Sequence, residues 1–536
     1  MGRSRFGLLN QVESISLDTK KRIIKKYNSD KGSGNSNYPA DIKDFVYDPN
    51  NDPTILDDGE KQFAYGVLID FRDGKKTDED GVVTRIGNMD FHRTLPCHTH
   101  AGQVYDIVNK QVVCKLNPED WNLPYDGKTA AEIKAAMETP TNTIEIHVDK
   151  FYCSSKVLHR NSNGNPDLFK VMFSPVKLNS NYFEIKEQAI DFRKCRLVKI
   201  NNAWRPVANL ATPNNASLLG GAQEYVQGYQ DDDAISIKTN NNGKVPITSI
   251  SRIDMRNFAQ GSRYMMNYYS YQYIIYWAFV IEYATLNSQK EVINELDANG
   301  FHQGGLGIGM TSIDEGITNW TNSDYYFNSN NASKSRPTVR NIGVTNSIGN
   351  NSGEIVTQEN GHTYHQNRYR GFEFPFGDIR LFMDGCGCFT VKEVVGVDGE
   401  NNEVKKEYIH YYLTNNPDNY VDTPVEVKEK MELIAKTELY SNFYGYDEGC
   451  FCSAIIGDKA LLIPCETAGA DETNYFYDYQ YGAGDFTDEE EATCIIDMGG
   501  VAVDDADAGL ADFGAGSDAS SADVYSGFSF MRFIAD

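Results

Sequence analysis

The sequence predicts an α+β fold that is mostly β. Residues 143–148 alternate between apolar and polar side chains, which is the period of a half-buried strand. Residues 63–70 form a second strand-like run, closed by the turn residues Asp73 and Gly74. The composition agrees, because 45 glycines and 33 tyrosines suit β structure with many loops.

Residues 1–61 are predicted to be an arm and a linker. Residues 18–26 favour a short basic helix, and residues 31–37 have the composition of a flexible linker. Two interpretations stay open: the arm tethers the protein to a partner, or it is a poorly ordered terminus. No apolar stretch of signal-peptide length precedes Gln11 and Glu13, so we expect no export by a standard signal.

Residues 62–213 are predicted to form a β-rich spacer domain with one helix at 128–137. Residues 214–246 are rich in Asn, Gly, Gln and Asp, which predicts a linker. The most apolar segment, residues 273–286, contains Glu282 and is too short to span a bilayer, so no membrane insertion is expected.

The second half, residues 247–536, begins with a strong helix candidate. Five residues fall on one helical face: Ile274, Trp277, Ala278, Ile281 and Thr285. Long loops rich in Gly and Asn follow, and the last 70 residues are dense in Asp, Gly, Ala and Ser.

Charge and motifs exclude several functions. With 50 basic and 76 acidic residues the net charge is −26, which disfavours nucleic acid and anionic membranes as partners. No Gly-x-Ser-x-Gly, His-Glu-x-x-His or phosphate-binding Gly-x-x-x-x-Gly-Lys motif occurs. The Gly-rich residues 304–309 do not sit in a strand–turn–helix unit, so we expect no enzymatic activity and no organic cofactor.

Ten segments of the chain, in this order, are similar to motifs of one known family of proteins. They are 84–96, 247–252, 276–289, 369–379, 383–385, 462–464, 478–479, 499–500, 507–509 and 527–532. The phrase at 276–289, YWAFVIEYATLNSQ, is the most specific of them. Together they resemble phage and prophage virion proteins that carry a C-type-lectin-like, formylglycine-generating-enzyme-like domain. Some of those proteins are tropism determinants, displayed on the virion to bind the host cell.

This resemblance implies that residues 247–536 form a C-type-lectin-like domain with one long core helix and long loops. Its C-terminal loops would make a solvent-facing platform that binds a protein or a glycan on the host surface. The contact residues implied are Val503, Asp504, Asp505, Ser517, Ser520, Asp523 and Tyr525. The platform is rich in aspartate and poor in aromatic residues, which weakens the glycan alternative and leaves a structural decoration or assembly role open.

The resemblance also implies a location and partners. The protein is expected in the virion, joined to other virion proteins through its N-terminal arm. A homo-oligomer is expected, although no heptad run specifies it.

Three groups of residues have metal-capable side chains. On neighbouring strands, the two Cys-x-Cys pairs would hold zinc, or copper as in oxidase members of the family; buried thiols and a disulfide are the alternatives. These cysteines are Cys386, Cys388, Cys450 and Cys452. The second group, His92, Cys97, His98 and His100, is either a metal site or a polar loop. Residues 504–507 suit calcium, with a solvated acidic surface as the alternative.

Overall fold

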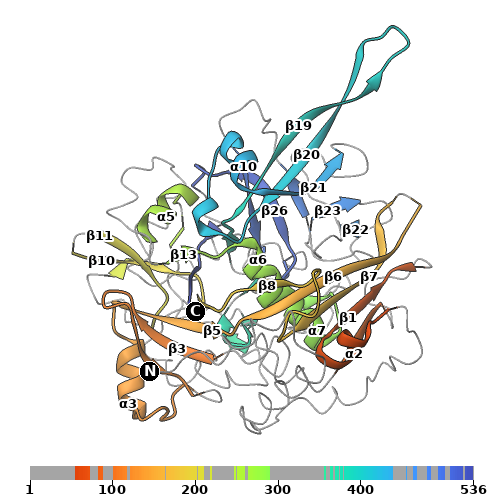
Figure 1. The fold of residues 1–536 in the computed structure, drawn as a ribbon. Coiled ribbons are helices and arrows are strands. Elements are labelled where there is room, and N and C mark those ends of the chain that lie inside the picture. Colours follow the sequence, from red (N-terminus) through yellow and green to blue (C-terminus); the bar gives the residue numbers. More distant parts are fainter. Residues whose placement is uncertain are drawn as a thin grey trace.

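The structure is a computed structural model (Figure 1). It describes residues 55–72, 82–88, 101–117, 121–210 (without 163 and 202), 218–219, 247–259 (without 249), 263–289, 355–357, 363–365, 368–438 (without 374 and 378), 454–455, 463–466, 480–483, 493–500, 508–522 and 526–534. Of these residues 46% are in strands and 19% in helices. The prediction of an α+β fold that is mostly β is confirmed.

A five-stranded antiparallel sheet is built from the first half of the chain. Its order is β2 (Val83–Gly87), β1 (Tyr65–Asp70), β7 (Pro166–Ser174), β6 (Phe151–Arg160) and β8 (Phe183–Ile185). The predicted strand at 63–70 is therefore β1, while its first residue ends a short helix, α2 (Asp58–Phe63). A capping box fixes the start of α2, because the Asp57 and Glu60 side chains each accept from the other's backbone N–H.

A six-stranded sheet combines both halves of the chain. Its order is β13 (Tyr264–Met265), β28 (Phe530–Phe533), β9 (Gln188–Asp191), β5 (Asn142–Val148), β3 (Ala101–Asp106) and β4 (Gln111–Lys115). The predicted strand at 143–148 is β5, but the expectation of a half-buried strand is wrong at Glu145, while His147 on the same face is partly exposed. Glu145 is fully buried, and Arg532 Nε donates to its Oε2 at 3.0 Å.

The largest sheet has eight strands and belongs to the second half. The main path is β21 (Glu432–Glu438), β20 (Glu403–Leu413), β19 (Cys386–Val397), β25 (Cys494–Met498), β18 (Arg380–Phe382) and β27 (Ser526–Gly527). β26 (Phe513–Asp518) joins it through β25, and β24 (Gln480–Ala483) pairs with β26. Strands β19 and β20 continue beyond the body as a long two-stranded ribbon (Figure 1).

Smaller elements complete the described part of the chain. The short sheets are β11 (Ala203–Val207), β10 (Arg196–Ile200) and β12 (Leu218–Leu219); β14 (Ile355–Thr357) and β15 (Thr363–His365); β16 (Arg368–Tyr369) and β17 (Phe372–Glu373); β22 (Ala454–Ile455) and β23 (Pro464–Glu466). The short helices are α3 (Ala130–Met137), α5 (Arg252–Ala259), the 3-10 helix η10 (Pro417–Asn419) and α10 (Pro424–Lys430). The helix predicted at 128–137 is therefore α3, which a capping box between Thr129 and Glu132 begins.

The predicted core helix lies at the centre of the molecule. It runs as α6 (Tyr268–Ser270), the π-helical η8 (Tyr271–Tyr276) and α7 (Trp277–Tyr283), and ends where Ala284 adopts a left-handed conformation with φ +55°. Thr285, predicted on the helix, lies beyond this end. Side chains on every face from Tyr268 to Glu282 are buried, because sheets lie on more than one side. Towards the five-stranded sheet, Trp277 packs on Phe169 with ring centroids 6.3 Å apart.

The two halves share one hydrophobic core. Its buried residues extend from Phe63 in α2 to Met531 in β28, and Met531 pairs with Ile190 of β9. The region predicted as a spacer and the region predicted as lectin-like are thus joined through a sheet and a core. The predicted boundaries at 61, 213 and 246 stay predictions, since residues 1–54 and nearly all of 211–246 lie outside the described residues.

Candidate functional site

Several of the segments quoted for the resemblance contact one another where the structure describes them. Arg252, the last residue of the segment 247–252, is fully buried. Its Nη1 donates to the carbonyl oxygens of Met383 at 3.3 Å and Cys386 at 2.9 Å. The segments 247–252 and 383–385 are therefore fixed to each other by a guanidinium.

An ion network extends this contact. Arg256 donates to both carboxylate oxygens of Asp384, at 2.9 and 2.7 Å, and to Asp422 at 2.6 Å. Burial acts to raise the pKa of Asp422, but the charges of Arg252 and Arg256 outweigh it and hold that pKa below its ordinary value. The network keeps α5 against the start of β19.

The core helix holds the segment 369–379 through a second ion pair. Arg370 Nε lies 2.6 Å from Glu282 Oε2, and Arg370 Nη2 lies 2.7 Å from Glu282 Oε1. Both side chains are 3% exposed, so this is a buried, bidentate ion pair. Its two residues come from two of the segments quoted for the resemblance, and one of these, 276–289, is the most specific.

The described parts of the Gly-rich C-terminal stretch, residues 499–500 and 508–512, lie against the segment 369–379 and the core helix. Gly377 N donates to Gly499 O at 2.7 Å, and Tyr271 Oη donates to Leu510 O at 2.8 Å. Gly499 has φ +98°, and a Cβ there would stand 2.9 Å from Pro375 O, so this close approach requires glycine.

The predicted contact residues are only partly within the described chain. Ser517 is half-buried on β26, opposite Ile495 of β25. Ser520 is exposed in the following turn, where its backbone N–H and hydroxyl both donate to Asp518 Oδ1. The others, Val503, Asp504, Asp505, Asp523 and Tyr525, lie outside the described residues, as does the calcium candidate at 504–507.

Of the two Cys-x-Cys pairs predicted to bind metal, only the first lies within the described residues. Cys386 and Cys388 are buried free thiols on β19, and burial raises the pKa of Cys386 to about 11. The strand neighbour of Cys388 is Cys494 of β25, a cysteine that the spacing argument did not consider. Cys450 and Cys452 lie outside the described residues, so the four-cysteine site stays a prediction; the same holds for His92, Cys97, His98 and His100.

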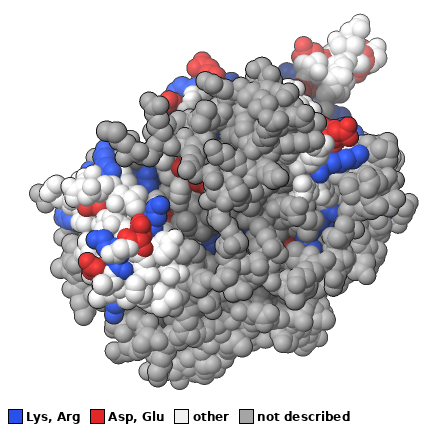
Figure 2. Space-filling view, turned by 60° about the horizontal axis from the view of Figure 1, so that its bottom comes forward, with Lys and Arg blue, Asp and Glu red and all other residues white. Residues whose placement is uncertain are grey.

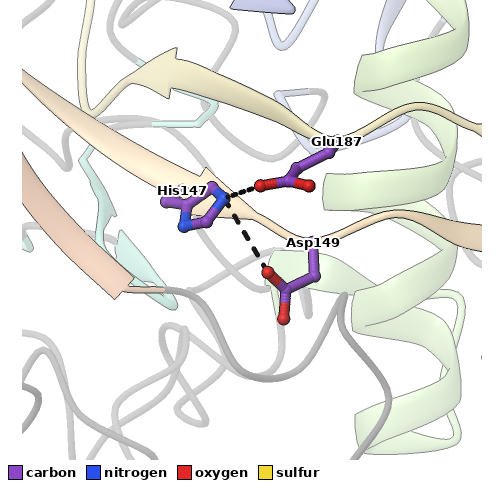
Figure 3. Close-up of side chains that lie close together, drawn as sticks. All are labelled: His147, Asp149 and Glu187. Carbon is purple, nitrogen blue, oxygen red and sulfur yellow. Dashed lines mark hydrogen bonds and ion pairs between the residues drawn. The ribbon is translucent and has the colours of Figure 1, made fainter. Parts of the chain in front are cut away.

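A cluster that the sequence reasoning missed lies at the end of β5 (Figure 3). His147 Nε2 is 2.9 Å from Glu187 Oε1 and 3.8 Å from Asp149 Oδ1. Within the described residues, these three form the one group of His, Cys, Asp or Glu arranged so that they could hold a metal ion. His147, on β5, and Asp149, directly after it, are two apart in the sequence, which is a readable signal. Glu187 joins them only through the pairing of β5 with β9.

Charge on the described surface is mixed. On the face in Figure 2, basic and acidic side chains lie beside one another. Phosphate-backbone binding needs clustered Lys and Arg, and the described part of this face has no such cluster. None of the helices in the described chain combines the length and apolar composition needed to cross a membrane.

These observations define the class of the protein as α+β, mostly β, with a central helix between sheets and a Gly-rich C-terminal segment packed against it. No family model matches the chain, and neither does any curated protein or solved structure.

Proposed function

We propose that the protein is a bacteriophage virion protein that attaches to a host-surface ligand through a C-type-lectin-like domain formed by residues 247–536. The observation that carries the proposal is that described parts of the resembling segments contact one another, at the core helix and at α5. Arg252 with Met383 and Glu282 with Arg370 join segments up to 131 residues apart. This arrangement supports a single structural unit built from the segments.

The binding surface proposed is the end of β26 and the turn after it. Ser520 and Gly516 are exposed there, and Ser517 and Asp518 are half-buried, so the backbone is fixed by the sheet while polar groups reach solvent. Binding is non-covalent, through these polar groups.

The ligand class that fits this surface is a protein with basic side chains. The only aromatic residue in 508–522 is Phe513, which is fully buried, so no aromatic face is open for a sugar ring within that stretch. Asp518 offers a carboxylate, and the net charge of −26 attracts a basic partner.

The test is binding of the labelled full-length protein to intact cells of the bacterial host. We expect saturable binding, weakened at least about tenfold by the double substitution Ser517→Arg, Ser520→Arg, because two bulky cations oppose a basic ligand. Ser180→Arg, in the exposed turn between β7 and β8, is the matched control and should bind as the unaltered protein does.

One observation favours a second function, in virion assembly. The ribbon of β19 and β20 carries exposed apolar side chains, including Val394 (53% exposed) and Val397 (65% exposed), which suit contact with a neighbouring virion subunit. If folded protein shows no saturable binding to host cells, the attachment proposal fails and assembly becomes the function to test.

A further inference from the structure

The geometry points to a site for a divalent transition-metal cation, of the zinc type, at His147, Asp149 and Glu187. The ligands would be one imidazole nitrogen and two carboxylate oxygens, with water in the remaining position. This inference is independent of the proposed attachment function.

The register of two strands brings the three side chains together. β5 pairs antiparallel with β9, so that His147 lies opposite Ala189 and Val148 lies opposite Gln188. Continued by one residue, this register sets Asp149 opposite Glu187. His147 and Asp149, two apart, lie on the same face of the sheet, and Figure 3 shows all three side chains converging.

The three side chains form a hydrogen-bonded ion pair with a second carboxylate beside it, and their ligand atoms are close enough to surround a metal ion. Tetrahedral zinc with ligands at about 2.1 Å sets neighbouring ligand atoms about 3.4 Å apart. His147 Nε2 stands 2.9 Å from Glu187 Oε1 and 3.8 Å from Asp149 Oδ1, which lie on either side of that value. All three ligand atoms lie within 4.8 Å of one another, so small side-chain rotations complete the geometry.

The negative charges of Asp149 and Glu187 favour the binding of a cation between them. Asp149 follows the end of β5 and Glu187 precedes the start of β9, and two carboxylates this close to each other repel. A divalent ion between the two carboxylates offsets their negative charges. The imidazole nitrogen favours zinc and similar transition metals, because calcium prefers oxygen ligands. The three side chains are 25%, 24% and 20% exposed, so solvent reaches the site while the strands keep it in shape.

The site would also fasten the end of the chain. Ile534 N donates to Glu187 O at 3.0 Å, directly after β28. A metal on Glu187 would hold β5 and β9 together at the place where the last described residues pack.

The experiment is a titration of metal-free, reduced full-length protein with Zn²⁺ against a chromophoric chelator. The variants are His147→Ala, Asp149→Asn and Glu187→Gln. The matched control is His159→Ala, which removes a histidine that lies 2.6 Å from a single carboxylate, Asp167 Oδ1. Every variant keeps all ten cysteines and the other histidines, so metal bound elsewhere cancels in the comparison.

We expect the unaltered protein and His159→Ala to bind one more equivalent of Zn²⁺ than each of the three site variants. If the site variants still bind this Zn²⁺ ion, we expect their affinity for it to be at least about tenfold lower. With Co²⁺ in place of Zn²⁺, that additional equivalent should show visible absorption without thiolate charge-transfer bands, because its ligands are nitrogen and oxygen. Zn²⁺ should raise the melting temperature of the unaltered protein but not that of Glu187→Gln.

Equal stoichiometry and affinity in the unaltered protein and all three site variants would overturn the proposal. Thiolate charge-transfer bands from the Co²⁺ ion that the site variants fail to bind would also overturn it. Glu187→Gln and Asp149→Asn preserve side-chain shape, so the result stands even if His147→Ala does not fold.

Discussion

Asp191 is a fully buried carboxyl group where strands from both halves of the chain meet. Its Oδ1 accepts from Thr143 Oγ1 at 2.7 Å and from Arg263 Nη2, and its Oδ2 accepts from the backbone N of Phe530 at 3.2 Å. Burial raises its pKa to about 6, against the lowering effect of Arg263 and Thr143. In the unfolded chain an aspartate titrates near 3.9.

This difference predicts a pH dependence of stability with a definite sign. Between about pH 4 and 6 the folded state binds the proton that the unfolded state has released, so stability rises as the pH falls through 6. Relative to Asp191→Asn, the unaltered protein should gain about 1.4 kcal/mol between pH 7.5 and pH 5, measured by urea unfolding at both values. Carboxylates common to both proteins cancel in the difference. A difference that stays constant with pH would show that Asp191 titrates as an ordinary aspartate.

Two residues show what the sequence could not predict: the burial of Glu145 and the position of Glu187 beside His147. The alternation at 143–148 located β5 correctly and set Glu145 and His147 on its second face. It could not tell that this face is also covered at Glu145, because the covering residues Arg263 and Arg532 are 118 and 387 positions away. Glu187 was missed for the same reason: its relation to His147 exists only in the register of β9.

At the scale of elements, the sequence predicted the position of a helix correctly where local interactions determine where the helix forms. α3 begins at a capping box that is readable from Thr129 and Glu132, and the apolar run before 283 located the core helix. The π-helical turn Tyr271–Tyr276 and the left-handed end at Ala284 were not predictable, since periodicity assumes 3.6 residues per turn throughout. The packing of Leu510 on the core helix could not be predicted from composition, because it depends on contacts with Tyr271 and Ser288, more than 220 positions away.

The projecting ribbon of β19 and β20 supports a prediction about an element. Glu393 pairs with Lys406, so residues 394–405 can be replaced by Asn-Gly, which closes that pair as a two-residue hairpin. We expect a melting temperature within a few degrees of the original, because Val394, Val395 and Val397 are exposed and their removal leaves no cavity. Thermal unfolding with light scattering measures both stability and self-association.

The control lies at the base of the ribbon. Val427 of α10 is fully buried beside Phe389, so Val427→Ala should cost about 2 kcal/mol. A shortened ribbon that destabilises the protein as much as this control would mean that the ribbon contributes to the fold of the body.

At the scale of the whole molecule, the last described strand connects the two halves. β28 pairs with β13 on one side and with β9 on the other, and Met531, between Tyr264 and Ile190, is fully buried. The sequence suggested separate domains because composition changes at 214–246. Yet a sheet shared by both halves couples their unfolding, since neither can lose its strands without exposing the core of the other.

Met531→Asp tests this coupling. A buried charge without a designed partner should cost more than about 3 kcal/mol, and the cost should fall on both halves. We expect calorimetry to show one transition in the unaltered protein and one in the variant, shifted to lower temperature. Hydrogen exchange should speed up in β5 and β9 as well as in β18 and β25. If the first half were an independent spacer, the variant would instead show two transitions, with β1, β6 and β7 melting at their original temperature. That outcome would make β28 an addition to a self-sufficient N-terminal sheet rather than the strand that unites the fold.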